Sequence, residues 1–244
     1  MAPGTFGAFE AERRIVYNSR RMKRPLVSFA LVLLVFRAEP LPFNISPQEA
    51  ARNIEKTFAS LHSLKADFEQ AYYSASLATP LLEKGKLFLQ KPDSMRWEYQ
   101  EPERNIYVYK GGVSLAFFPE DNQLFRHTLS PEEKDWPVFS LLTGKAKITE
   151  AYTIEEAEFP TDKKESVQLK LIPLEEGELS YILVEANPRT WLLEAVISLD
   201  WAGNKQEYRF SGFELNPRLN ARIFEIEVPP GCEVIEDLPP GKNN

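Results

Sequence analysis

Apolar and polar residues alternate in short runs along most of this chain, and this pattern restricts the fold more than any other feature. In one run Met95, Trp97 and Tyr99 alternate with charged or polar neighbours. A period of two places successive side chains on opposite faces of a β-strand. Turn sequences such as Gly111-Gly112 separate the runs. Short strands with regularly spaced turns predict an antiparallel sheet that is curled or closed.

We expect about eleven strands from this pattern, together with two helices. These strands are expected among twelve segments that alternate or have the composition of strands, at about 64–69, 86–90, 95–100, 104–110, 113–118, 123–128, 150–159, 166–173, 180–187, 191–200, 205–215 and 221–229.

The first helix is expected over residues 47–60. Ser46-Pro47-Gln48-Glu49 has the composition of a capping box, with proline at the first helical position. Ala50, Ile54, Phe58 and Leu61 then recur at helical spacing. The segment therefore predicts one amphipathic helix with a single apolar face.

A second, shorter helix is expected over residues 131–142, where it interrupts the strands. Ser130-Pro131-Glu132-Glu133 repeats the capping pattern, and Trp136, Phe139 and Leu142 follow at helical spacing. Gly144 lies just after the apolar residues, as is common where helices end.

The N-terminal region has the layout of a secretory signal. A basic cluster at 20–24 directly precedes the apolar run Leu26–Phe36. This run is too short to span a bilayer, which takes about 20 residues. We therefore expect export, with residues 1–38 as an N-terminal extension and signal peptide and 39–244 as one folded domain. Translation could start at Met1 or Met22, and we place cleavage somewhere within 36–43.

Charge excludes some classes of partner. The formal net charge is −7, and the residues after 38 include 22 basic and 34 acidic side chains, a net charge of −12. Nucleic acid and anionic lipid surfaces both attract basic proteins, so we expect no nucleic acid as partner. Cys232 is the only cysteine, so the chain cannot form an internal disulfide.

The sequence shows no arrangement that predicts catalysis, a metal site or a cofactor. The two histidines, His62 and His127, lie on different expected elements, and neither has a cysteine or carboxylate at ligand spacing. Motifs for a nucleophile elbow, a zinc protease, a phosphate-binding loop and a dinucleotide site are all missing. We therefore expect a protein that is not an enzyme and that needs no cofactor.

Several short motifs follow one another in a familiar order. They are Phe68-Glu69-Gln70, Gly85-Lys86-Leu87, the block from Lys91 to Tyr99, Gly111-Gly112, Leu141-Leu142-Thr143-Gly144, Phe224-Glu225-Ile226 and Pro230-Gly231-Cys232. Over nearly all of 46–236 this order resembles that of the LolA-type outer-membrane lipoprotein carrier family. The block from Lys91 to Tyr99 is the most specific piece.

The resemblance implies a mostly β, α+β fold: an incomplete, curled antiparallel β-barrel whose helices cover an apolar cavity. It implies a periplasmic chaperone for the acyl chains of lipoproteins. The cargo would come from an inner-membrane ABC-type lipoprotein-releasing transporter and pass to an outer-membrane lipoprotein receptor, and we expect a monomer. In the family a basic residue, usually Arg, precedes the proline of the block and contacts the lid. Lys91 stands there in this chain.

The candidate site consists of cavity-lining strand residues, a lid and the latch residue Lys91. Because buried hydrocarbon is worth so much free energy, a carrier that must also release its cargo needs an apolar lid that the cargo displaces. The helix over 131–142 is the candidate lid, with Trp136, Phe139 and Leu142. Which face of each strand lines the cavity stays open. The candidates for the lining are Leu87, Leu89, Met95, Trp97, Tyr99, Ile106, Val108, Leu115 and Phe117.

Two other classes of function remain open at this stage. One is a sensor or regulator of the same fold that binds lipid or lipoprotein and transfers nothing. The other is an exported β-rich enzyme, which convergent polar groups in the cavity would favour and a dry apolar cavity would exclude.

Overall fold

A computed structural model describes residues 45–74, 78–129 and 137–236. The proposed signal peptide and Trp136 lie outside these residues. The elements are α1 Pro47–Ser60, β1 Ser63–Tyr73, β2 Leu81–Gln90, β3 Ser94–Glu101, β4 Ile106–Lys110, β5 Val113–Phe118, β6 Gln123–Thr128, α2 Pro137–Thr143, α3 Ile148–Ala151, β7 Tyr152–Glu156, β8 Val167–Pro173, β9 Leu179–Ala186, β10 Leu193–Asp200, β11 Lys205–Leu215, the 3₁₀ helix η2 Ala221–Phe224 and β12 Glu233–Glu236.

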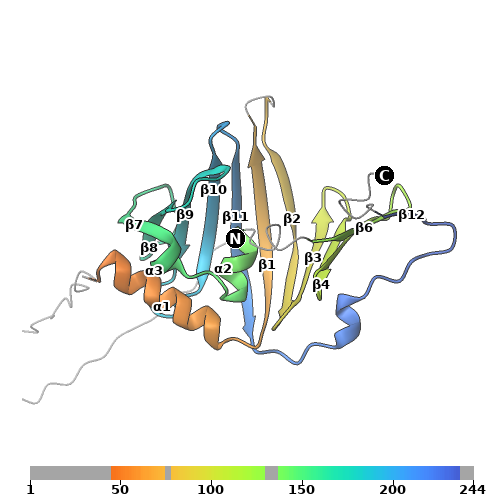
Figure 1. Ribbon diagram of the computed structural model, residues 1–244, viewed down its shortest axis with the longest axis horizontal. Coiled ribbons are helices and arrows are strands. Elements are labelled where there is room, and N and C mark those ends of the chain that lie inside the picture. Colours follow the sequence, from red (N-terminus) through yellow and green to blue (C-terminus); the bar gives the residue numbers. More distant parts are fainter. Residues whose placement is uncertain (1–44, 75–77, 130–136, 237–244) are drawn as a thin grey trace, which may run out of the picture. The chain divides into compact units, whose positions relative to one another are not determined.

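The described strands form one curled, unclosed sheet of 12 strands in the order β12-β6-β5-β4-β3-β2-β1-β11-β10-β9-β8-β7 (Figure 1). All neighbours pair antiparallel except β12, which runs parallel to β6. The pairing of β1 with β11 joins the two halves of the sheet. The expected fold, a mostly β chain with an incomplete antiparallel barrel, is confirmed.

The end of the chain differs from the prediction. No strand occupies 221–229: residues 221–224 form η2, and the strand that follows is β12. Asn220 starts η2, because its side-chain oxygen accepts a hydrogen bond from the Arg222 backbone N–H at 3.0 Å. Pro229 and Pro230 cannot donate to a strand ladder. The expected strand at 150–159 is also shorter, because the helix α3 extends to Ala151.

Helix α1 forms as the sequence predicts. The Ser46 hydroxyl accepts a hydrogen bond from the Glu49 backbone N–H at 3.2 Å, which satisfies one of the free donors at the helix start. The apolar face is buried through Ala50, Ile54 and Phe58. This face holds the helix against the sheet.

Around β4 and β5 the sheet carries apolar residues on both of its faces. Helices α1 and α2 lie on one face of the sheet, the inner face (Figure 1). Residues of both helices pack there with Phe68, Trp97 and Phe210 in the main core. On the outer face, Phe224 of η2 packs against Val108 and its neighbours in a second cluster. Strands β4 and β5 therefore lie between two apolar layers. Alternate side chains of these strands point to opposite faces, and each face is covered by other parts of the protein.

An aromatic group at the centre of the inner face depends on one glycine. Phe68 of β1 pairs with Gly85 of β2, and its ring lies 4.9 Å from those of both Trp97 and Tyr99, edge to face. A Cβ on Gly85 would lie 2.1 Å from the backbone oxygen of Glu98 and 2.8 Å from the Phe68 ring. Glycine therefore allows β2, β3 and the Phe68 ring to approach each other.

We predict that Gly85→Ala destabilises the fold. The added methyl group meets a backbone oxygen, which cannot rotate away, and such overpacking costs about 1–3 kcal/mol. Urea unfolding followed by tryptophan fluorescence should show this loss. Gly177→Ala is the matched control, because no atom lies within 4 Å of its added Cβ. Equal stabilities for the two variants would contradict the assigned role of Gly85.

Candidate functional site

A cavity of about 430 Å³ opens on the inner face between the sheet and α2. This volume falls within the range of about 300–1,000 Å³ found for small-molecule sites. The lining residues come from strands β1–β5 and β11, from α2 and from the segment before it: Gln70, Glu83, Met95, Trp97, Tyr99, Tyr107, Val108, Tyr109, Ser114, Leu129, Phe139, Gln206 and Tyr208.

The apolar end of the cavity lies beneath α2. The Phe139 ring is 4.6 Å from the Tyr109 ring, edge to face. Beside it, the Trp97 indole N–H donates to the Met95 sulfur at 3.0 Å. Leu142 of α2 is fully buried in the same core. Helix α2 thus places apolar side chains over this end of the cavity.

The opposite end of the cavity is polar. The Tyr99 hydroxyl donates to Gln70 Oε1, and Gln206 Nε2 donates to the Tyr208 hydroxyl at 2.8 Å. Burial raises the pKa of both tyrosines above the ordinary value, so their hydroxyls are protonated at neutral pH. The pKa of the Glu83 carboxyl is raised as well, first by burial and then by the charge of Glu103. This end offers neutral hydrogen-bonding groups and one carboxyl group.

Lys91 joins the turn between β2 and β3 to the last turn of α1. Its ammonium donates to the backbone oxygens of Phe58 and, at 3.4 Å, of Ala59, in the last turn of α1. Helix α1 has no basic residue of its own there, so Lys91 supplies donors that its terminal carbonyls lack. Gly144, just after α2, touches the same turn: a Cβ there would lie 2.8 Å from the carbonyl carbon of Phe58. Burial lowers the pKa of Lys91.

The structure divides the predicted lining residues between two faces. Met95, Trp97 and Tyr99 line the cavity, and Leu87 and Leu89 lie beside them in the inner core. Ile106, Leu115 and Phe117 belong instead to the outer cluster under η2. Val108 packs in that cluster and also borders the cavity. The side chains of Ile106, Leu115 and Phe117 therefore lie on the face away from the cavity. The alternation along a strand predicts which residues share a face of the sheet, but not which of the two faces encloses a cavity.

Several cavity residues escaped the sequence analysis. Tyr107 and Tyr109 alternate with Ile106 and Val108, and pairing with Trp97 and Met95 places them on the inner face. Their aromatic side chains at every second position of β4 were the available signal. Gln70, Glu83, Gln206 and Tyr208 gave no such signal, because polar residues in alternating strands usually face solvent.

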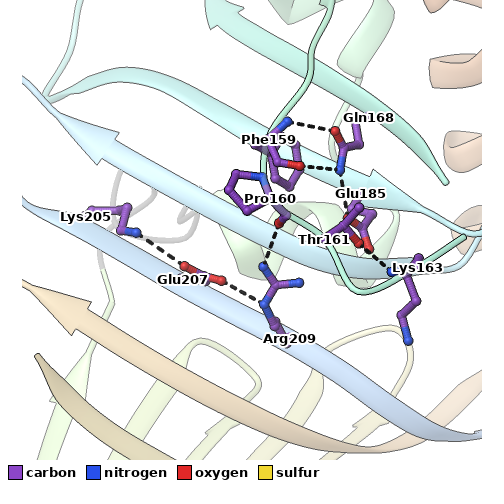
Figure 2. Close-up of polar contacts among 9 residues, drawn as sticks. All are labelled: Phe159, Pro160, Thr161, Lys163, Gln168, Glu185, Lys205, Glu207 and Arg209. Carbon is purple, nitrogen blue, oxygen red and sulfur yellow. Dashed lines mark hydrogen bonds and ion pairs between the residues drawn. The ribbon is translucent and has the colours of Figure 1, made fainter.

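A second polar cluster lies on the outer face of β8–β11 (Figure 2). Glu185 is fully buried there, and its carboxylate accepts a hydrogen bond from Gln168 Nε2 at 3.0 Å. The Gln168 side chain also bonds the backbone N–H and oxygen of Phe159. Arg209 donates to the Pro160 oxygen at 3.4 Å. These contacts hold the segment around 159–161 against the sheet, on the face opposite the cavity.

Within the part of the chain that the structure describes, His, Cys, Asp and Glu side chains form no group of three or more that could hold a metal ion. None of its helices is both long and apolar enough to cross a membrane.

Comparisons with known proteins agree on one family. The family model described as outer membrane lipoprotein carrier protein LolA matches residues 59–227, more than half of the chain. An outer-membrane lipoprotein carrier protein of Xanthomonas oryzae pv. oryzae is 26% identical over 189 residues, covering 77% of this chain and 89% of its own. One from Chromohalobacter salexigens is 26% identical over 214 residues, covering 86% and 98%.

A solved structure supports the fold alone. The chain matches an uncharacterized conserved protein from Thermus thermophilus with a TM-score of 0.50 at 14% identity, over 78% of this chain and 98% of that one.

We predict that Lys91→Ala loosens the junction between α1 and α2. The variant loses two hydrogen bonds from a charged donor, which contribute on the order of 1.5 kcal/mol or more together. Hydrogen exchange should become faster at the last turn of α1 and in α2, and the free energy of unfolding should fall. Lys56→Ala, at an exposed position of α1, should change neither quantity. Unchanged exchange in Lys91→Ala would contradict the junction.

Proposed function

The chain belongs to the outer membrane lipoprotein carrier protein LolA family, and from this premise we propose that it shields the acyl chains of lipoproteins as they cross the periplasm. The observation that carries the proposal is the inner-face cavity, whose apolar end lies directly beneath α2. Members of this family are carriers by description, so the proposed activity is binding and transfer rather than catalysis.

The size of the cavity fits a state without cargo. A methylene group fills about the volume of a water molecule, roughly 30 Å³, so 430 Å³ accommodates about one long acyl chain. A triacylated anchor needs more room than that. Side chains that now occupy the inner face must move aside when cargo enters, and Phe139 and Leu142 of α2 are the candidates.

Energetics support such a displacement. An anchor with about 45 methylene groups would gain on the order of 30 kcal/mol if buried in an empty apolar pocket, at about 0.8 kcal/mol per group. Known affinities level off near 20 kcal/mol, and cargo bound so tightly would never leave. Expelling α2 from its apolar contacts offsets part of the gain. The lid therefore makes release possible.

Lys91 and Gly144 give the lid a defined closed position. Both contact the last turn of α1, so α1 and the end of α2 are fastened at one point. An ammonium group forms weaker and less directional contacts than the guanidinium fork of arginine. We therefore propose that Lys91 acts as a latch that opens readily.

We propose that the chain acts in the periplasm, between two membrane-bound partners. Export through the N-terminal signal places the mature chain in the periplasm. An inner-membrane ABC-type transporter delivers acylated lipoproteins to it, and an outer-membrane receptor accepts them. The carrier works as a monomer.

A release assay tests this function. Protein comprising residues 39–244 would be added to spheroplasts that display a triacylated lipoprotein and contain the lipoprotein-releasing transporter. We expect lipoprotein in a soluble complex with the protein. If nothing is released while a fluorescent acyl probe still binds, the chain is a lipid-binding sensor rather than a carrier.

We predict that Phe139→Ala binds a triacylated lipopeptide about tenfold more tightly. Truncating a buried phenylalanine removes roughly 3–5 kcal/mol of packing, and part of this loss falls on the closed state that competes with cargo. Displacement of a fluorescent acyl probe measures the affinity. Phe125→Ala, which alters an exposed ring, is the control. Weaker binding by Phe139→Ala alone would contradict the lid.

A further inference from the structure

The polarity of the cavity changes in one direction along the strands. Met95, Trp97 and Tyr99 follow one another on the inner face of β3, so the cavity wall extends about 13 Å at roughly 3.3 Å per residue. Tyr99 lies opposite Gly85 in β2, and two residues further along β2 comes Glu83, opposite Gln70. The cavity thus begins with apolar groups under α2 and ends with polar ones.

Three of the polar side chains at this end are buried, and Glu83 and Gln206 are partly exposed. Buried polar groups are unusual for a site that holds only hydrocarbon. Gln70 and Tyr99 are each 8% exposed, and Tyr208 is 1% exposed. Polar side chains in such positions destabilise a protein unless they are hydrogen-bonded. Here they bond to each other: Gln70 with Tyr99, Tyr99 with Tyr208, and Tyr208 with Gln206. A site that bound only acyl chains would not need polar side chains here, because apolar residues at these positions would bind hydrocarbon equally well.

We propose that the Gln70–Tyr99 and Gln206–Tyr208 pairs bind the ester and amide groups that link acyl chains to the first residue of a lipoprotein. This inference rests on the proposed function, which it deepens. Tyrosine hydroxyls and glutamine N–H groups donate to ester and amide carbonyls, and the glutamine oxygens accept from an amide N–H. The acyl chains then extend towards Phe139.

The direction of the cargo peptide follows from the same register. Past Gln70 and Glu83, β1 and β2 continue to Tyr73 and Leu81 at their shared hairpin. Strand β11 begins at Lys205, just before Gln206. The peptide therefore leaves the cavity at the end where the β1–β2 and β10–β11 hairpins lie side by side, as the pairing of Tyr73 with Lys205 shows.

Charge at the polar end selects among lipids. Among the described residues that line the cavity, Glu83 is the only carboxylate, and no lysine or arginine is present. The charge of Glu103 also acts on Glu83. A fatty-acid carboxylate or a phospholipid phosphate would meet a like charge without a cationic partner. The site therefore favours uncharged acyl esters and amides.

The test removes each glutamine together with the tyrosine that it bonds, because a buried polar group that loses its partner costs stability by itself. The variants are Gln70→Leu with Tyr99→Phe, and Gln206→Leu with Tyr208→Phe. Gln100→Leu is the control, because Gln100 is exposed and adjoins Tyr99 on β3. Probe displacement would compare a triacylated lipopeptide with hexadecane, and methyl palmitate with palmitate, after circular dichroism has confirmed folding.

We expect the wild type and Gln100→Leu to prefer the lipopeptide over hexadecane, and methyl palmitate over palmitate. Each double variant should lose about tenfold in lipopeptide affinity while its affinity for hexadecane stays the same or rises. Unchanged lipopeptide affinity in both folded double variants would overturn the subsite and leave the carrier function standing. Failure of the wild type to bind any acyl ligand would instead overturn the carrier function itself.

Discussion

The pairing of β1, β2 and β3 around Gly85 is the constraint on which the site depends. Without a side chain at Gly85, the Phe68 ring can lie across β2 and contact both Trp97 and Tyr99. The same register places Met95 at the apolar end of the cavity and Tyr99 at the polar end. A slip of one residue would turn every one of these side chains to the outer face. The register therefore defines both the cavity and its polarity.

Binding and release make opposite demands on such a cavity. Hydrocarbon burial favours binding by far more free energy than a reversible carrier can use. The proposed lid would reduce this excess: α2 covers the apolar end of the cavity, and Lys91 and Gly144 both lie against the last turn of α1. In this account the closed lid and the cargo compete for one apolar surface. In the same account, the polar end of the cavity orients the lipoprotein anchor by binding its ester and amide groups.

Alternation, capping patterns and turns were enough to predict the sheet, α1 and the position of α2. They were not enough to predict which side chains lie on the inner, cavity-lining face of the sheet. Ile106 and Phe117 alternate as regularly as Trp97 does, yet η2 covers them from the outside. That covering segment comes from more than 100 residues away in the chain, so no local pattern reports it. Gln70 and Gln206 were missed because their burial depends on the same kind of long-range packing.

The most direct test of the account locates the acyl chains in the complex. A lipopeptide with a spin label at the end of one acyl chain would be bound to the protein, and paramagnetic broadening of backbone amide signals would be mapped by NMR. The account predicts the strongest broadening around Met95 and Phe139. Broadening centred on Ile106 and Phe117, or spread over the exposed surface, would contradict the claim that the inner-face cavity holds the cargo.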